Sequence, residues 1–202
     1  MPSDPMSSSS GLRLVLGSTS AYRRSLLERL GIPFTVAAPN VDEAALPGEQ
    51  PIDLVHRLAR AKADSVAERH AKCLVIGSDQ LAVSGREVLG KPGSGERAIA
   101  QLRQLSGQRV TFYTAVHVVN SETRSNEGHL DVTTVNFRTL TDEEIQSYVA
   151  RDKPYHCAGG FKIEALGVAL FTRVESQDPT ALIGLPLIWL SGALRRNGFK
   201  VP

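Results

Sequence analysis

Apolar residues along the chain follow two patterns, short unbroken or alternating runs and longer stretches with helical spacing. The runs at 12–16 (LRLVL) and 73–77 (CLVIG) predict buried strands, while 110–119 and 130–139 alternate and predict two antiparallel strands. Strands and helices alternate early in the chain, so we predict an α/β fold with a mixed sheet. The predicted helices are 22–30, 53–70, 94–105, 141–149 and 186–197, and the remaining predicted strands are 34–38 and 168–174, with a short hairpin over 81–90. Thr141 and Glu144 predict a capping box at the start of helix 141–149.

Composition narrows the class of protein. A chain of 202 residues that is 42% hydrophobic can bury a core without a metal or disulfide staple. The 23 Lys and Arg nearly balance the 21 Asp and Glu, which argues against binding to a nucleic-acid polymer or to a membrane surface. With only two cysteines, no signal-peptide pattern and no run of about 20 apolar residues, we expect a cytoplasmic protein. Residues 1–10, rich in Ser and Pro, predict a disordered tail.

The first candidate site is the junction between strand 12–16 and the helix that follows. Ser18, Thr19 and Ser20 bring hydroxyl groups to a helix N-terminus, where free N–H groups attract anions. Arg23 and Arg24 lie in the first turn, where the helix dipole disfavours positive charge. The pattern indicates either a bound anion or an ordinary cap followed by two solvated arginines.

The second candidate is a lysine on the apolar face of helix 53–70. Lys62 falls in the middle of the apolar stripe formed by Leu54, Val55, Leu58, Ala59 and Val66. Its ammonium group either reaches past this stripe to solvent or projects into a cleft, where a phosphate would balance its charge.

Carboxylates after apolar strands form the third candidate. Asp79 directly follows strand 73–77, and ligands of α/β sheets bind at the carboxyl ends of strands. Asp79 is either a turn or capping residue or a metal ligand or base. Asp42 and Glu43 follow another strand, and Lys91 follows the hairpin. Together, these groups are what metal-dependent phosphoryl chemistry requires.

Several motifs occur in a fixed order over residues 12–200. They are STSAYRR (18–24), VDE (41–43), the Lys62 helix, IGSDQ (76–80), GKP (90–92), TFYTAV (111–116) and CAGGFKIE (157–164). This set resembles the Maf family of nucleotide pyrophosphatases, which convert nucleoside triphosphates to monophosphates and diphosphate with a divalent cation, Mg²⁺ or Mn²⁺. The resemblance implies that residues 11–202 form one domain of the inosine-triphosphatase-like type, an elongated mixed sheet flanked by helices with two lobes around a central cleft. It also implies a homodimer.

The resemblance further implies roles for individual residues. Asp79 would be the catalytic carboxylate, either activating water or helping to hold the metal, and Glu43 would assist at the metal. The residues expected to bind the triphosphate are Ser18, Arg23, Arg24, Lys62 and Lys91.

Three positions resemble the branch of the family that acts on 7-methyl-GTP. These are Tyr22, Gln80 and Glu164, where the dTTP/UTP branch has arginine, threonine and glutamine. Methylation at N7 makes guanine cationic, so an aromatic face attracts it, and a carboxylate can accept hydrogen bonds from its N1–H and amino group. Tyrosine stands at 22 where tryptophan is expected, and Ala165 stands where relatives often have glycine.

Three functions follow from these observations. The first is a 7-methyl-GTP pyrophosphatase that removes a modified nucleotide before polymerases use it. The second is a broader pyrophosphatase for noncanonical nucleotides, and the third is a non-catalytic nucleotide-binding regulator of septum formation. Retention of Asp79, Lys62 and Lys91 favours an enzyme, because a protein that only binds nucleotide needs no water-activating carboxylate.

Overall fold

The computed structural model describes residues 11–201, so the tail predicted at residues 1–10 lies outside the described residues. The contacts between residues divide the chain into two compact units. Unit 1 contains the described residues up to Gln80, Thr114–Asp131 and those from Asp178 onward, and unit 2 contains Leu81–Tyr113 and Val132–Gln177. The predicted arrangement of two lobes around one cleft stays a prediction. In chain order the elements are β1 (Arg13–Leu16), α1 (Ala21–Glu28), β2 (Thr35–Val36), α2 (Pro51–Ala67), β3 (Cys73–Ser84), β4 (Glu87–Leu89), α3 (Gly95–Leu105), β5 (Arg109–Asn120), β6 (Asn126–Phe137), α4 (Asp142–Asp152), η1 (Ala158–Gly160), η2 (Leu166–Leu170), β7 (Phe171–Glu175), η3 (Ala181–Ile183) and α5 (Leu187–Arg196).

The strands of the described chain form one mixed sheet. Their order is β2-β1-β3-β5-β6-β7, with β4 paired to β3. β1 runs parallel to β2 and β3, whereas β4 is antiparallel to β3 and β7 is antiparallel to β6. The predicted α/β class with a mixed sheet flanked by helices is therefore confirmed.

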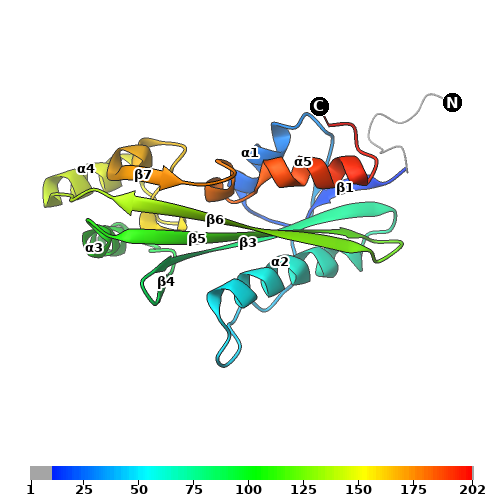
Figure 1. Cartoon of the computed structure of the whole chain (residues 1–202), viewed down its shortest axis with the longest axis horizontal. Coiled ribbons are helices and arrows are strands. Elements are labelled where there is room, and N and C mark those ends of the chain that lie inside the picture. Colours follow the sequence, from blue (N-terminus) through cyan, green and yellow to red (C-terminus); the bar gives the residue numbers. More distant parts are fainter. Residues whose placement is uncertain (1–10, 202) are drawn as a thin grey trace. The chain divides into compact units, whose positions relative to one another are not determined.

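Unit 1 has helices on both faces of its part of the sheet. α1 and α5 cover one face and α2 covers the other (Figure 1). Side chains on successive strand positions point to opposite faces, which explains the unbroken apolar runs. Leu16 and Ile76 belong to the core that includes α1 and α5, whereas Val15 and Val75 pack with Val66 of α2.

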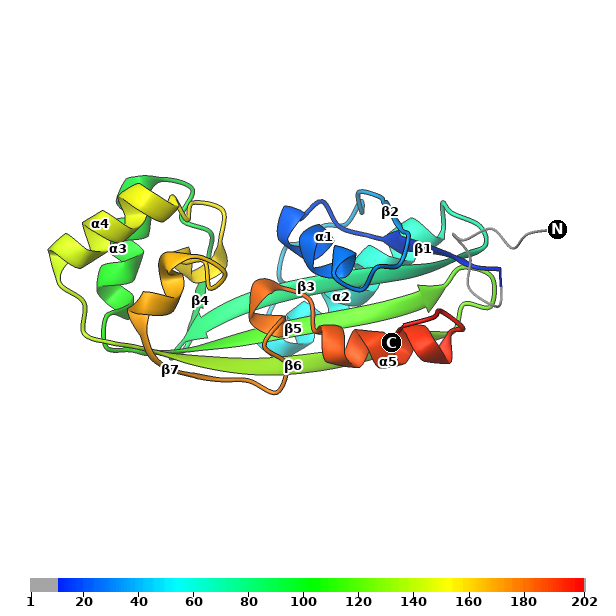
Figure 2. The same cartoon turned by 90° about the horizontal axis from the view of Figure 1, so that it is seen from above.

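Unit 2 is held by a helix pair and a cluster of aromatic rings. α3 packs against α4, as Figure 2 shows. The predicted capping box is present at the start of α4, where Thr141 and Glu144 each bond the other's backbone N–H. The ring of Phe161 contacts the rings of Phe112, Phe137 and Phe171 edge to face, and those of Phe137 and Phe171 also contact each other. The distances between ring centroids are 4.8–5.7 Å.

The main correction to the predicted elements concerns β3. The sequence predicts a strand over 73–77 that ends before Ser78, but the strand continues to Ser84, so Asp79 lies within it rather than in a loop after it. Polar residues were expected to end the strand. They do not, because Ser78 bonds a backbone carbonyl and Asp79 bonds Lys62, which satisfies both polar groups inside the sheet.

Smaller corrections concern element ends. The strand predicted over 168–174 begins only at Phe171, because Leu166–Leu170 forms a 3₁₀ turn. The strand predicted over 34–38 is reduced to β2, and Pro186 is the N-cap of α5 rather than its first helical residue. Within residues 11–201, no helix combines the length and apolar character needed to cross a membrane.

Candidate active site

A buried lysine joins two carboxylates in unit 1. Nζ of Lys62, on α2, lies 2.6 Å from Oδ1 of Asp79 on β3 and 2.7 Å from Oε1 of Glu43 in the loop before α2. Lys62 is 5% exposed and Asp79 is 7% exposed, while the side chain of Glu43 is 63% exposed. The ammonium group therefore does not reach bulk solvent, so the first of the two predicted alternatives is wrong, and projection into a cleft stays a prediction. Asp79 is likewise no capping or turn residue.

A glycine on β3 brings α2 close enough for this contact. Gly77 lies two residues before Asp79 and so faces the same side of the strand. A Cβ atom there would overlap the carbonyl oxygen of Ala59 and lie 2.6 Å from the backbone nitrogen of Ala63, both on α2. Only glycine permits this approach, which places Lys62 of the same helix against Asp79.

The N-terminus of α1 holds one arginine inward. Oγ of Ser20 caps the helix by accepting the backbone N–H of Arg23. The Arg23 side chain donates from Nε to the carbonyl oxygen of Gly184 at 3.0 Å and from Nη1 to Oγ of Ser18 at 3.4 Å. Burial lowers the pKa of the Arg23 guanidinium, and the negative charges of Asp79 and Glu43 partly oppose that shift. The group stays cationic at neutral pH, so a partly desolvated positive charge lies near this helix end.

Ser18 is a second polar side chain that faces inward at the junction between β1 and α1. Its side chain is buried, and Oγ accepts hydrogen bonds from the backbone N–H of Ser20 at 3.2 Å and from Arg23. A hydroxyl oxygen that accepts two such bonds keeps its own proton for donation. Ser18 and Arg23 therefore both carry donors suited to a phosphate oxygen.

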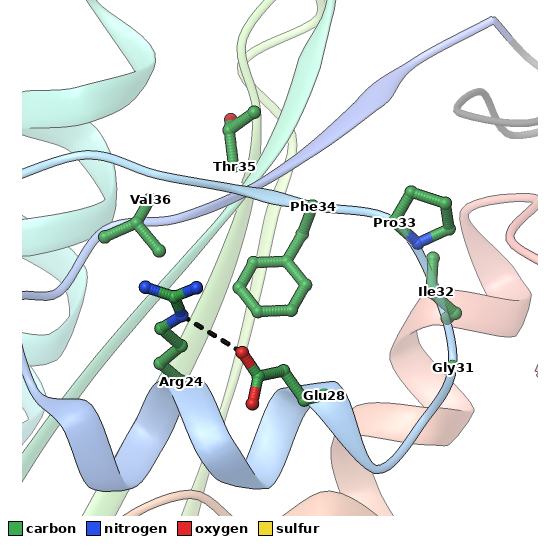
Figure 3. A pocket seen from close by; sticks show the side chains of 8 residues that line it. All are labelled: Arg24, Glu28, Gly31, Ile32, Pro33, Phe34, Thr35 and Val36. Carbon is green, nitrogen blue, oxygen red and sulfur yellow. Dashed lines mark hydrogen bonds and ion pairs between the residues drawn. The ribbon is translucent and has the colours of Figure 1, made fainter.

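The other arginine of the motif points elsewhere. Arg24 is exposed and forms an ion pair with Glu28 one helical turn on, with Nε 3.0 Å from Oε1. The two side chains line a pocket together with residues 31–36, and Figure 3 shows Phe34 facing them across it. The structure thus brings Arg23, and not Arg24, to Ser18, and phosphate binding by Arg24 stays a prediction.

Two of the three predicted specificity residues lie in unit 1. Tyr22 is half-buried on α1, directly before Arg23. Gln80 is the residue after Asp79 on β3, and its Nε2 donates to Oγ1 of Thr114 at 2.9 Å and to the carbonyl oxygens of Ala181 and Leu182 at 2.9 and 3.1 Å. Because its amide nitrogen meets protein acceptors, the Gln80 side chain helps to hold the turn at η3.

The other predicted residues belong to unit 2 and are exposed. Lys91 lies in the loop after β4, and this loop is attached to the segment between α4 and η1 by a hydrogen bond from the Gly93 N–H to the carbonyl oxygen of Tyr155 at 2.8 Å. Glu164 lies in a turn that closes when Gly167 N–H donates to the carbonyl oxygen of Lys162 at 3.0 Å. A Cβ at position 167 would overlap that oxygen, so the turn carrying Glu164 requires glycine there.

Asp79 and Glu43 are the residues that could hold a divalent cation. Asp79 and Glu43 contact the same ammonium group, so they are near neighbours, and carboxylate oxygens are the ligands that Mg²⁺ and Mn²⁺ prefer. In the described part of the chain, no group of three or more His, Cys, Asp or Glu residues is arranged to hold a metal. A site with two carboxylates suits Mg²⁺ bound jointly by protein and phosphates.

Sequence reasoning missed three members of this environment. Ser78 and Thr114 are fully buried and bond the turn at 181–184, and the carbonyl oxygen of Gly184 accepts from Ser78 as well as from Arg23. Polar residues inside an otherwise apolar strand were the available signal, because a buried hydroxyl needs a partner. The acceptors could not be found from sequence, since they lie 106 residues after Ser78 and 67 residues after Thr114 along the chain.

Comparison with known proteins agrees with the motif resemblance. The family model described as "Maf-like protein" matches residues 13–197. A protein of Albidiferax ferrireducens named 7-methyl-GTP pyrophosphatase is 51% identical over 94% of this chain and 95% of its own length. Relatives with the same name from Thiobacillus denitrificans and Pseudomonas putida are 52% identical over 93% and 50% identical over 95% of this chain, covering 94% and 100% of their own lengths.

Proposed function

The chain belongs to the Maf family, and from this premise we propose that it hydrolyses 7-methyl-GTP to 7-methyl-GMP and diphosphate. The observation that carries the proposal is the identity of about one half, over more than nine tenths of the chain, with relatives named for this activity. The enzyme is then a hydrolase of the phosphoanhydride bond, with a house-cleaning role against a modified nucleotide.

Phosphate binding is assigned to donors that the fold holds in place. Ser18 and Arg23 offer a hydroxyl and a guanidinium at a helix N-terminus, and both donors are already oriented by hydrogen bonds within the protein. Lys62 and Lys91 add positive charge. Because diphosphate is the leaving group, cationic donors on its oxygens stabilise charge that grows in the transition state.

Asp79 is assigned to activation of the attacking water. Its carboxylate is buried and kept oriented by the Lys62 ammonium at 2.6 Å, so it does not need to be reorganised when substrate binds. Asp79 and Glu43 would hold Mg²⁺ or Mn²⁺, which supplies Lewis-acid stabilisation of the phosphates when it is bound. Lys62 keeps the two carboxylates that would hold the cation close together.

Selection of the base is assigned to Tyr22, Gln80 and Glu164. The aromatic face of Tyr22 attracts the cationic methylated ring by ~0.5–2 kcal/mol. The carboxylate of Glu164, exposed at the tip of its turn, can accept hydrogen bonds from the N1–H and amino group of guanine. A thymine or uracil ring offers only one N–H donor, so a carboxylate there favours a guanine derivative.

Product analysis with an Asp79 variant tests the proposed reaction. Wild-type protein with 7-methyl-GTP and Mg²⁺ should release 7-methyl-GMP and diphosphate in equal amounts on ion-exchange chromatography. Asp79→Asn should lower kcat by about 10²–10⁴-fold, the usual contribution of a general base. Asp64→Asn, on the opposite face of α2, is the matched control and should keep its activity. Near-normal turnover by Asp79→Asn, or release of orthophosphate, would contradict the proposal.

Cation dependence tests the assignment of the metal. Removal of divalent cations with EDTA should abolish turnover, and added Mg²⁺ or Mn²⁺ should restore it. Glu43→Gln should raise the Mg²⁺ concentration needed for half-maximal rate, because one carboxylate ligand is lost. Turnover in EDTA equal to that in Mg²⁺ would refute this assignment.

Two further properties rest on the family resemblance. We propose that the protein is a homodimer and that it acts in the cytoplasm. Light scattering coupled to size-exclusion chromatography tests the first, with a mass near twice 21.8 kDa expected and a mass near 21.8 kDa refuting it.

A further inference from the structure

Three polar side chains on neighbouring strands hold one turn: Ser78 and Thr114, which are buried, and Gln80, which is half-buried. Ser78 and Gln80 lie two residues apart on β3 and so face the same side, and Thr114 lies on the adjacent strand β5. Oγ of Ser78 donates to the carbonyl oxygen of Gly184 at 3.0 Å, and Oγ1 of Thr114 donates to that of Ala181 at 3.1 Å. Gln80 donates to Thr114 and to the turn itself.

The orientation of the Gln80 amide follows from chemistry. Both main-chain partners of its Nε2, at Ala181 and Leu182, are carbonyl oxygens, which only accept. If the amide were flipped, its Oε1 would face these two carbonyl oxygens, and no hydrogen bond could form between them. The Thr114 hydroxyl accepts from Gln80 and donates to Ala181, so the hydroxyl and the amide act as one clamp on the turn.

The clamped turn also carries the acceptor that orients Arg23. Gly184 has φ of +128°, and its carbonyl oxygen accepts from Ser78 and from Nε of Arg23, each at 3.0 Å. A guanidinium is planar, so a bond at Nε directs the N–H groups of both terminal nitrogens. Among the described residues, Arg23 Nη1 contacts Ser18, and Nη2 has no hydrogen-bond partner.

We propose that Ser78 and Thr114 are positioning residues of the phosphate site, which act by locking the turn 181–184 so that Gly184 aims the Arg23 guanidinium. The proposal rests on the proposed function only in taking Arg23 as a phosphate ligand. It gives Gln80 a second role, holding the turn, beside any contact with the base. It also assigns a function to the TFYTAV motif, which contains Thr114.

A double-mutant cycle on phosphate binding tests the proposal. The probe is inorganic tripolyphosphate, which has three linked phosphates like the substrate but no base, and its Kd is measured by calorimetry in Mg²⁺. Ser78→Ala and Thr114→Val should each raise Kd about three- to tenfold, the usual effect of one lost hydrogen bond. In an Arg23→Ala background the same two changes should alter Kd by less than about twofold, because the group they aim is gone.

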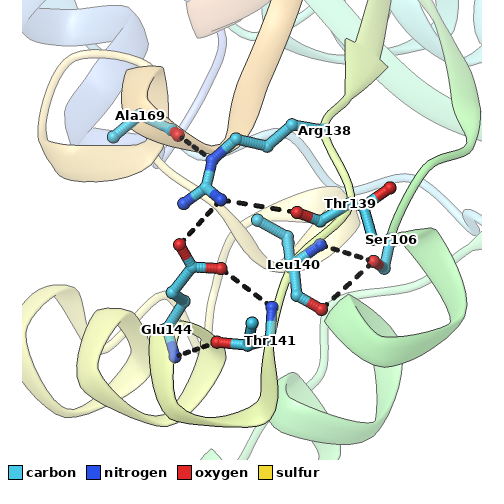
Figure 4. A network of polar contacts seen from close by, with 7 residues as sticks. All are labelled: Ser106, Arg138, Thr139, Leu140, Thr141, Glu144 and Ala169. Atoms are coloured by element: carbon cyan, nitrogen blue, oxygen red, sulfur yellow. Dashed lines mark hydrogen bonds and ion pairs between the residues drawn. The ribbon is translucent and has the colours of Figure 1, made fainter.

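Matched variants separate positioning from a general loss of structure. Thr114→Ser keeps the hydroxyl and should bind tripolyphosphate as the wild type does. Ser106→Ala removes two hydrogen bonds to Leu140 in unit 2, drawn in Figure 4, and should lower stability without changing Kd. If Ser78→Ala fails to fold, Ser78→Cys retains a weaker donor of similar size and should give a smaller increase.

The outcomes distinguish this proposal from the proposed function. Equal increases in Kd with and without Arg23, or no increase with Arg23 present, would overturn it. A collapse of the preference for 7-methyl-GTP over GTP in Thr114→Val, with tripolyphosphate binding unchanged, would also overturn it, because Thr114 would then act through the base. If the wild type failed to hydrolyse 7-methyl-GTP, the proposed function would be wrong, while the tripolyphosphate cycle would still decide this proposal.

Discussion

Replacing Lys62 by methionine removes the charge at the centre of the site while keeping most of the side-chain volume. At 2.6 Å and an effective dielectric constant of about 20, the Coulomb attraction between Nζ and Asp79 is ~6 kcal/mol, from which the cost of desolvating the ammonium must be subtracted. The carboxylate of Asp79 would remain only 7% exposed and without its partner. Breaking a buried pair in this way lowers the free energy of unfolding by about 3–5 kcal/mol. We expect a loss near the lower end of this range, because the other carboxylate that contacts Lys62, that of Glu43, is largely exposed and remains solvated by water without the ammonium group.

Urea unfolding followed by tryptophan fluorescence measures this loss. The single tryptophan, Trp189, lies in unit 1 with Lys62, so its emission reports on the perturbed unit. Lys62→Met should lower the free energy of unfolding by about 3 kcal/mol, and Asp79→Asn added to it should recover part of the loss. Arg60→Met, which breaks an exposed pair with Asp64 on the same helix, should cost less than about 1 kcal/mol. Equal losses for Lys62→Met and Arg60→Met would refute the argument that the central pair is buried and coupled.

Two further predictions concern stability away from Asp79. Burial, with smaller contributions from the neighbouring His56 and Arg60, lowers the pKa of His117 to about 4, so the folded state disfavours its protonation. The unfolded chain takes up this proton near pH 6.5, and the stability due to neutral His117 should therefore be complete above pH 6.5 and decrease as the pH falls towards 4. His117→Gln should flatten this part of the urea midpoint–pH curve, and a curve parallel to that of the wild type would contradict the assignment. Thr141→Ala removes the capping box of α4 and should lower the free energy of unfolding by ~1 kcal/mol, measured by circular dichroism, with kcat/KM unchanged. An unchanged free energy of unfolding would show that the cap is not needed.

Hydrophobic periodicity predicts most of the helices and strands, because most of them bury one continuous apolar face. The stripe on helix 53–70 predicted the buried face of α2, including Lys62, and the Thr141–Glu144 motif predicted a cap that the structure contains. The end of β3 was missed for a physical reason. Polarity usually ends a buried strand, but here each polar side chain meets a partner from a distant segment, and periodicity carries no information about such partners.

The candidate site shows the same division between local and distant information. A helix start with two adjacent arginines indicates either an anion site or an ordinary cap with two solvated arginines. Only the three-dimensional structure separates Arg23, which faces Ser18, from Arg24, which pairs with Glu28. Residues one position apart on a helix point about 100° apart, so they cannot share one ligand easily. The role of Gly184 was out of reach, because its contribution is a main-chain carbonyl that no side-chain pattern encodes.

Competition among nucleotides tests the proposed substrate most directly. Wild-type protein is given equal concentrations of 7-methyl-GTP, GTP, dTTP and UTP with Mg²⁺, and each nucleotide and product is followed by chromatography over time. We predict that 7-methyl-GTP is consumed first, with 7-methyl-GMP and diphosphate formed in equal amounts. Consumption of dTTP or UTP ahead of 7-methyl-GTP would contradict it.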